Sequence, residues 1–267
     1  MHEVQRLEAR RFGALLVLLC TVVFNPVPGA QAQSVEVTGL RIVGPGMGRN
    51  GSEIRAFDTG PGLTVALGFD VPSGVQLVEI DSSGCELEAL TQDDGTSLLE
   101  DVDWGFFPDV SEDGRAGMIE FSNARRPGAG TKSLRARGKL ALRVAGEAQS
   151  GTVKGFAAKE GTEFQAAGDT FLVQKAGEDE EYGGYSLVLE TKAETADRIS
   201  ELHFKTADGE EIDINGQSTM TMGSRTQLEF YIENSTRPAV LDLVWFDELE
   251  SLEVPFDVEF GLALGIK

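Results

Sequence analysis

Residues 63–87 read LTVALGFDVPSGVQLVEIDSSGCEL, and their pattern predicts consecutive β-strands. Apolar residues alternate with small or polar residues over 63–71 and again over 75–80, which is typical of strands with one buried face. Between the second strand and the next one, Asp81-Ser82-Ser83-Gly84 supplies a turn. We therefore expect a strand–turn–strand unit in this part of the chain.

The same apolar pattern recurs 124 residues later in the chain. The aligned pairs are Leu63 with Leu187, Val65 with Leu189, Val75 with Ile199, Val78 with Leu202 and Ile80 with Phe204. Further along, residues 119–121 match 228–230, and Arg126-Pro127 matches Arg237-Pro238. We interpret this similarity as a divergent duplication of one strand plan.

The predicted fold class is all-β, because almost every periodic segment alternates with period two and none sustains a helical period over three turns. The duplication predicts two tandem immunoglobulin-like antiparallel β-sandwich domains over residues 33–163 and 164–267. The first contains a loop insertion at 97–113. The plan is similar in outline to immunoglobulin-like exported bacterial domains. The paired cysteines around a buried Trp are missing, so this resemblance implies topology and no functional residue.

Residues 1–32 are typical of a cleaved signal peptide. Arg6, Arg10 and Arg11 precede an apolar run at 15–24, and Ala30-Gln31-Ala32 supplies small residues for cleavage. That run is too short to span a membrane, which takes about 20 apolar residues. We expect an exported protein, periplasmic or extracellular, without stable membrane insertion.

Charge and residue content exclude several classes of function. The net charge of −21 repels phosphate backbones, so nucleic-acid binding is not expected. Without the signal peptide, His203 is the only histidine and Cys85 the only cysteine. Cys85 alternates with Leu87, which predicts a buried thiol with no disulfide. A histidine-assisted hydrolase and a zinc site both lack their residues, so we predict a protein that is not an enzyme. An acid-dependent hydrolase is the residual enzymatic alternative.

Two loop features are candidate binding sites. Asp93, Asp94, Asp101 and Asp103 supply oxygen ligands of the kind that calcium prefers, although turns also recruit Asp for backbone reasons. No other cofactor is predicted. Trp104, Phe106 and Phe107 lie in the 97–113 insertion and could stack on a sugar or a partner protein. The alternative is that these rings fold back onto the core.

A basic row marks the strand at 134–144. Arg135, Arg137, Lys139 and Arg143 share its polar phase, whereas the polar phase of the last strand, 252–260, is acidic. Three interpretations are open: cross-strand ion pairs, docking of one domain on the other, or an anionic partner. The predicted function is a non-catalytic, exported structural or protein-binding module. The alternative is a carbohydrate-binding module that uses the Trp104 loop, so the expected partner is another protein or a glycan.

Overall fold

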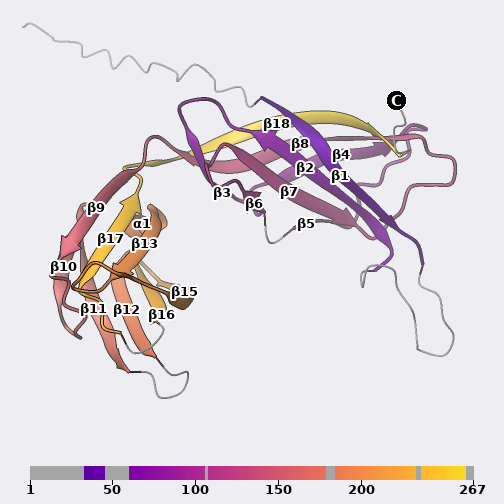
Figure 1. The fold of residues 1–267 in the computed structure, drawn as a ribbon. Coiled ribbons are helices and arrows are strands. Elements are labelled where there is room, and N and C mark those ends of the chain that lie inside the picture. The colour runs from indigo at the N-terminus through magenta and orange to yellow at the C-terminus, as the bar shows by residue number, and fades with distance from the viewer. Residues whose placement is uncertain (1–32, 46–59, 106–107, 179–183, 233–235, 263–267) are drawn as a thin grey trace, which may run out of the picture. The chain divides into compact units, whose positions relative to one another are not determined.

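The computed structural model describes residues 33–45, 60–105, 108–178, 184–232 and 236–262 of the 267-residue chain (Figure 1). These residues form antiparallel β-sheets, which confirms the all-β prediction. One short helix, α1 (Ala193–Asp197), interrupts the strands. The expected signal peptide at 1–32 lies outside the described residues.

The first sheet pair contains strands from both ends of the chain. One sheet has the order β1-β2-β7-β5, with β6 also paired to β7, and the other has the order β18-β8-β3, with β4 also paired to β8. The strands are β1 (Gln33–Val43), β2 (Gly62–Asp70), β3 (Gln76–Ile80), β4 (Glu86–Gln92), β5 (Val102–Trp104), β6 (Asp109–Val110), β7 (Ala116–Asn123), β8 (Ser133–Ala145) and β18 (Leu249–Gly261).

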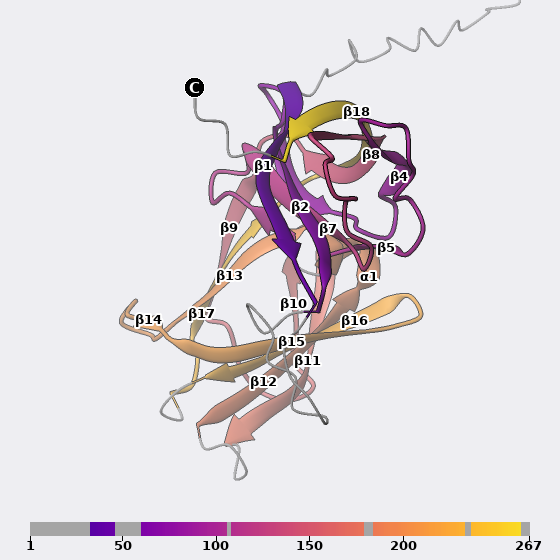
Figure 2. The ribbon, with the colours of Figure 1, turned by 90° about the vertical axis from the view of Figure 1, so that its right-hand side faces the viewer.

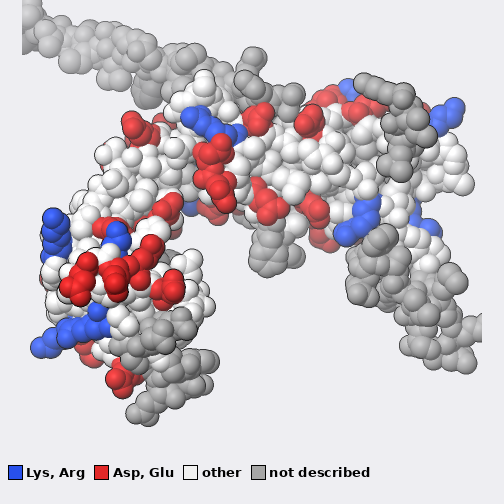
Figure 3. All heavy atoms as spheres, viewed as in Figure 1, with Lys and Arg blue, Asp and Glu red and all other residues white. Residues whose placement is uncertain are grey.

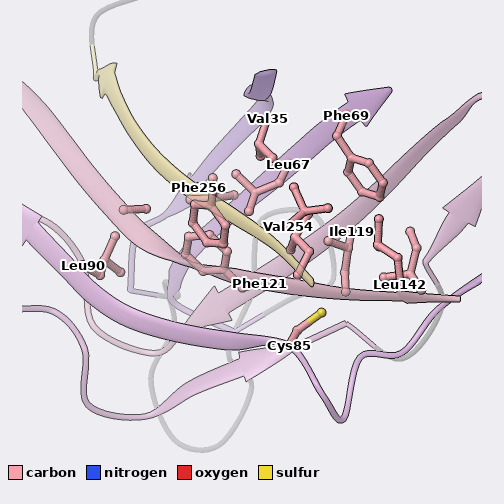
Figure 4. Packing of buried hydrophobic residues seen from close by; sticks show 14 of the residues in the cluster. Val35, Leu67, Phe69, Cys85, Leu90, Ile119, Phe121, Leu142, Val254 and Phe256 are labelled. Carbon is pink, nitrogen blue, oxygen red and sulfur yellow. The ribbon is translucent and has the colours of Figure 1, made fainter. Parts of the chain in front are cut away.

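A single hydrophobic cluster lies between these two sheets. Leu67 and Phe121 reach it from one sheet, and Leu142 and Phe256 reach it from the other (Figure 4). All four side chains are buried, and removing a side chain of this size from water contributes about 1.5–3 kcal/mol. Alternate burial along β2 and β7 therefore builds a β-sandwich, as the period-two pattern predicts.

The second sheet pair is built on the same plan. Its sheets have the orders β10-β11-β12-β16-β15 and β14-β13-β17-β9. The strands are β9 (Gln149–Lys154), β10 (Glu163–Ala166), β11 (Asp169–Glu178), β12 (Tyr185–Lys192), β13 (Ile199–Lys205), β14 (Glu211–Ile212), β15 (Ile214–Met222), β16 (Arg225–Ile232) and β17 (Val240–Trp245). Phe171, Leu187, Phe204 and Leu241 form the centre of its own cluster.

The strands of the predicted repeat occupy equivalent places in the two sheet pairs. Val65 lies opposite Phe121 in the β2–β7 pair, and Leu187 lies opposite Phe230 in the β12–β16 pair. The sequence alignment matches Leu187 with Leu63 instead, so the strand register differs by two residues between the copies. A slip of two keeps every side chain on the same face, and both cores are therefore preserved.

The strands that follow β8 and β17 are exchanged between the sheet pairs. β8 leads into β9, which pairs with β17, and β17 leads into β18, which pairs with β8. The predicted division at 163/164 assigned 149–154 to the first half and 249–261 to the second, which differs from this pairing. Period-two alternation tells which face of a strand is buried, but it does not tell which sheet the strand joins.

Candidate binding surfaces

The basic row on β8 meets carboxylates of its own sheet. The carboxylates come from all three strands that pair with β8, namely β18, β3 and β4. The shortest N–O distances are Arg135 to Asp257, 2.6 Å; Arg137 to Glu88, 3.0 Å; Lys139 to Glu253, 3.0 Å; and Arg143 to Glu79, 2.9 Å. The hydrogen bond to Asp257 raises the pKa of Arg135, and the one to Glu253 raises the pKa of Lys139. This arrangement favours the cross-strand interpretation, and an anionic partner would have to compete with these carboxylates.

Two of the four aspartates in the calcium hypothesis accept hydrogen bonds from backbone N–H groups. Asp94 Oδ1 accepts the Thr96 N–H at 2.8 Å, and this bond lowers the pKa of Asp94. Asp93 Oδ2 accepts the Lys132 N–H at 3.3 Å. Asp101 sits at a turn with φ of 60°, and Asp103 is exposed on β5. Within the described ranges no three acidic, His or Cys side chains group as metal ligands. Calcium binding stays a prediction.

Trp104 is half-buried on β5 and faces the first cluster. Its ring meets Phe121 edge to face, with centroids 5.5 Å apart and planes at 71°. Asn123 fixes the start of the insertion, because its Nδ2 donates to the carbonyls of Leu98 at 2.5 Å and Glu100 at 2.7 Å. Contact with the core reduces the ring surface that Trp104 can offer to a sugar. Phe106 and Phe107 lie outside the described residues.

His203 and Cys85 occupy separate places. His203 Nε2 lies 2.9 Å from Glu201 and Nδ1 lies 3.1 Å from Glu211, and the bond to Glu201 is the main cause of its raised pKa. Cys85 belongs to the first cluster, where burial raises the pKa of the thiol. A raised thiol pKa opposes thiolate formation, so the environment of Cys85 does not activate a nucleophile.

A hollow on the outer face of the β1-β2-β7 sheet was missed by sequence reasoning. Its volume is about 580 Å³. The central strand β2 turns only Thr64, Ala66, Gly68 and Asp70 to this face, because 63, 65, 67 and 69 enter the core. Gly68 and Thr38 both line it, and the Thr38 methyl group packs over Gly68, because a Cβ added to this glycine would lie 2.5 Å from Thr38 Cγ2. The sequence signal was this run of small residues on the non-core phase of a strand.

Apolar and acidic groups line this outer hollow. Met118 and Val110 are its apolar side chains toward β7 and β6, and Glu36, Asp70 and Asp109 are its charged groups. No Lys or Arg is among the described residues that line it. Acidic side chains are also spread over the face of the molecule seen in Figure 3. The outer hollow therefore fits an apolar side chain flanked by positive charge.

Comparison with known proteins adds little. No protein-family model and no curated protein matches this chain. Among solved structures, this chain is similar to the AgI/II polypeptide BspA C terminal domain of Streptococcus agalactiae, with 11% sequence identity over 80% of this chain and 96% of that domain chain. Its TM-score is 0.15, which is too low to support an inference. The one described helix is too short to cross a membrane.

Proposed function

We propose that this chain is a non-catalytic, exported protein-binding module made of two immunoglobulin-like β-sandwiches. Residues 33–145 together with 249–261 form the first sandwich, and residues 149–245 form the second. The two separate hydrophobic clusters support this division. The observation that carries the function is the acidic outer hollow over Gly68, which is open to a protruding side chain of another protein.

The chemistry of the outer hollow defines the partner segment. Met118 is unbranched and adapts to irregular shapes, so it can contact an incoming aliphatic or aromatic side chain. Burying such a side chain contributes about 1.5–3 kcal/mol. Glu36, Asp70 and Asp109 then attract Lys or Arg on either side of the inserted residue, which increases the association rate at low salt. We expect a basic segment with one central apolar residue.

Substitutions on one face of β7 test this proposal. Met118→Lys places a cation in the outer hollow, whereas Ser122→Lys places the same charge four residues away on the same face of β7. Proteins from the surface and culture medium of the source cells are passed over immobilised wild type and both variants. We expect one basic protein to bind wild type and Ser122→Lys but not Met118→Lys, and to elute at high salt.

The carbohydrate alternative is tested with a glycan array. If the wild type binds a glycan and Trp104→Ala abolishes that binding while the folded core is retained, the protein-binding proposal is wrong. Equal capture of the same protein by Met118→Lys and wild type would also contradict it, because the outer hollow would then take no part.

A further inference from the structure

β15 is an open sheet edge of an unusual kind. It is the last strand of the sheet β10-β11-β12-β16-β15, and among the described strands its one partner is β16, with which it forms a hairpin (Figure 2). Its nine residues read INGQSTMTM and include no charged residue. Every other strand that the structure describes carries at least one Asp, Glu, Lys or Arg, in a chain of which 25% is charged. An edge strand without charge is open to pairing with another strand.

The other long edges are protected against such pairing. β18 carries Pro255 and four acidic residues, and β1 carries Glu36, Arg41 and two register shifts in its pairing with β2. β10 has only four residues and β14 only two. β15 has one shift near its start, between Ile214 and Gly216, and then runs regularly to Met222. Among the described edges, β15 lacks the usual protective features of charge, proline and short length.

Both faces of β15 are suited to contact. Thr219 lies opposite the inward-facing Leu228, so it points to the inner side and helps line a cleft of about 170 Å³ toward β13. Met220 and Met222 lie on the outer side and are 59% and 55% exposed, more than any other large apolar side chain that the structure describes. Exposed apolar groups beside unpaired backbone mark this edge as an interface.

We propose that β15 pairs antiparallel with β15 of a second copy, forming a two-fold dimer through a continuous sheet. In such a pair, residues of equal phase face each other. Over 216–222, Met therefore lies opposite Gly, Ser or Met, and Thr lies opposite Thr or Gln, in any two-fold register. No register brings like charges together. A strand with the acidic composition of the rest of this chain would instead repel its own copy.

The net charge of −21 does not prevent this approach. On the neighbouring strand β16 the acidic residue is Glu229, which accepts a hydrogen bond from Ser218 at 3.2 Å. Across the new pair, the two Glu229 strands are separated by three strand spacings, about 14 Å. The Debye length at physiological salt is about 8 Å, so this repulsion is largely screened. Dimerisation should therefore strengthen as salt is raised.

Sedimentation of the purified protein over a concentration series tests the proposal. We expect a reversible monomer–dimer equilibrium for wild type, favoured by added NaCl. The double variant Thr219→Lys/Met220→Lys should weaken the dimer at least about tenfold, because the edge then carries charges that face their copies. Leu40→Lys, a change at an exposed position of the β1 edge, should leave the equilibrium unchanged. Thermal melts should show that all three proteins are folded.

Single cysteines locate the pairing. In a background with Cys20 replaced by Ser and Cys85 replaced by Ala, the variants Ser218→Cys, Thr219→Cys and Met220→Cys each place the only thiol near the expected two-fold axis. Directly opposed residues have Cβ atoms about 4.5–5.5 Å apart, within reach of a disulfide after a small adjustment. We expect one of the three to cross-link on mild oxidation, whereas Leu40→Cys should not.

A monomer at every concentration would overturn the proposal. A dimer that survives the double lysine substitution, or that cross-links at Leu40→Cys and at none of the β15 positions, would overturn it as well. A monomeric chain that captures a different protein through β15 would also do so. The outer hollow lies on another sheet, so failure of this proposal is distinguishable from failure of the proposed function.

Discussion

At the scale of single residues, the local contacts of His203 make stability depend on pH. The pKa of His203 is raised above its usual 6.5, first by the hydrogen bond to Glu201 and further by Glu211. A group whose pKa is higher in the folded state contributes stability below its unfolded pKa and loses it as pH rises through the folded pKa. Two acceptors on one imidazole thus favour the protonated ring.

We predict that the free energy of unfolding decreases as pH rises from about 6 to about 8. The drop should be small, because 43% of the His203 side chain is exposed. Urea titrations at several pH values measure it. His203→Gln should flatten the profile within this window, and a variant that keeps the same slope would assign the effect to another group.

Cys85 gives a second prediction at this scale. The thiol is buried in the first cluster, its Sγ accepts the Ala141 N–H at 3.4 Å, and burial raises its pKa. Because the thiolate is the reactive form, alkylation by iodoacetamide should be at least about a hundred times slower in the native protein than in urea. Mass spectrometry of timed samples measures this ratio, and rapid labelling of the native protein would show that the thiol is accessible.

At the scale of elements, β8 depends on a residue without a side chain. A Cβ added at Gly138 would overlap the carbonyl oxygen of Glu86 and press on Leu87 Cα, which is backbone of the neighbouring strand β4. Gly138→Ala should therefore destabilise the protein by about 1–3 kcal/mol or more. Gly146→Ala is the matched control, because nothing lies within 4 Å of its added Cβ. Equal midpoints for both variants in urea would contradict this packing.

The insertion after β4 depends on hydrogen bonds from the side chain of Asn123. This buried side chain donates to Leu98 and Glu100, and its Oδ1 accepts the Arg125 N–H at 2.5 Å. Asn123→Ala leaves the buried Leu98 carbonyl without its donor and should cost about 1–3 kcal/mol. Trp104 fluorescence should shift to longer wavelength as β5 loosens. Ser122→Ala, at the exposed neighbouring position, should change neither quantity.

At the scale of the whole molecule, the exchange of β9 and β18 means that two segments of the chain connect the two sheet pairs, one from β8 to β9 and one from β17 to β18. The last residue pair of the β9–β17 ladder is Gln149 with Trp245, and the first pair of the β8–β18 ladder is Ala145 with Leu249. Three residues on each strand, 146–148 and 246–248, separate these two pairs, so the register continues from one sheet to the next. The C-terminal strand is therefore part of the first core, although the chain reaches it last.

This topology predicts which half a C-terminal substitution affects. Phe256 is buried in the first cluster, and Phe256→Ala should destabilise that cluster by about 3–5 kcal/mol. Trp104 packs on the first cluster and Trp245 on the second. In variants that each keep only one of the two Trp residues, the fluorescence of Trp104 reports on the first cluster and that of Trp245 on the second. We expect the Trp104 transition to move to lower urea by more than the Trp245 transition. The reverse order would contradict the exchange.

The sequence by itself determined the class of structure and the faces of the strands. Alternation along 63–71 placed Leu63 and Val65 in a core, and the phase of Cys85 placed its thiol there too, because side-chain period is a local property of extended backbone. Only the tertiary structure decided that β18 joins β8, that the basic row meets Glu79 and Asp257, and that small residues on β2 leave a hollow. Sheet pairing is formed by backbone hydrogen bonds that carry little sequence information, and so the choice of partner depends on the whole chain.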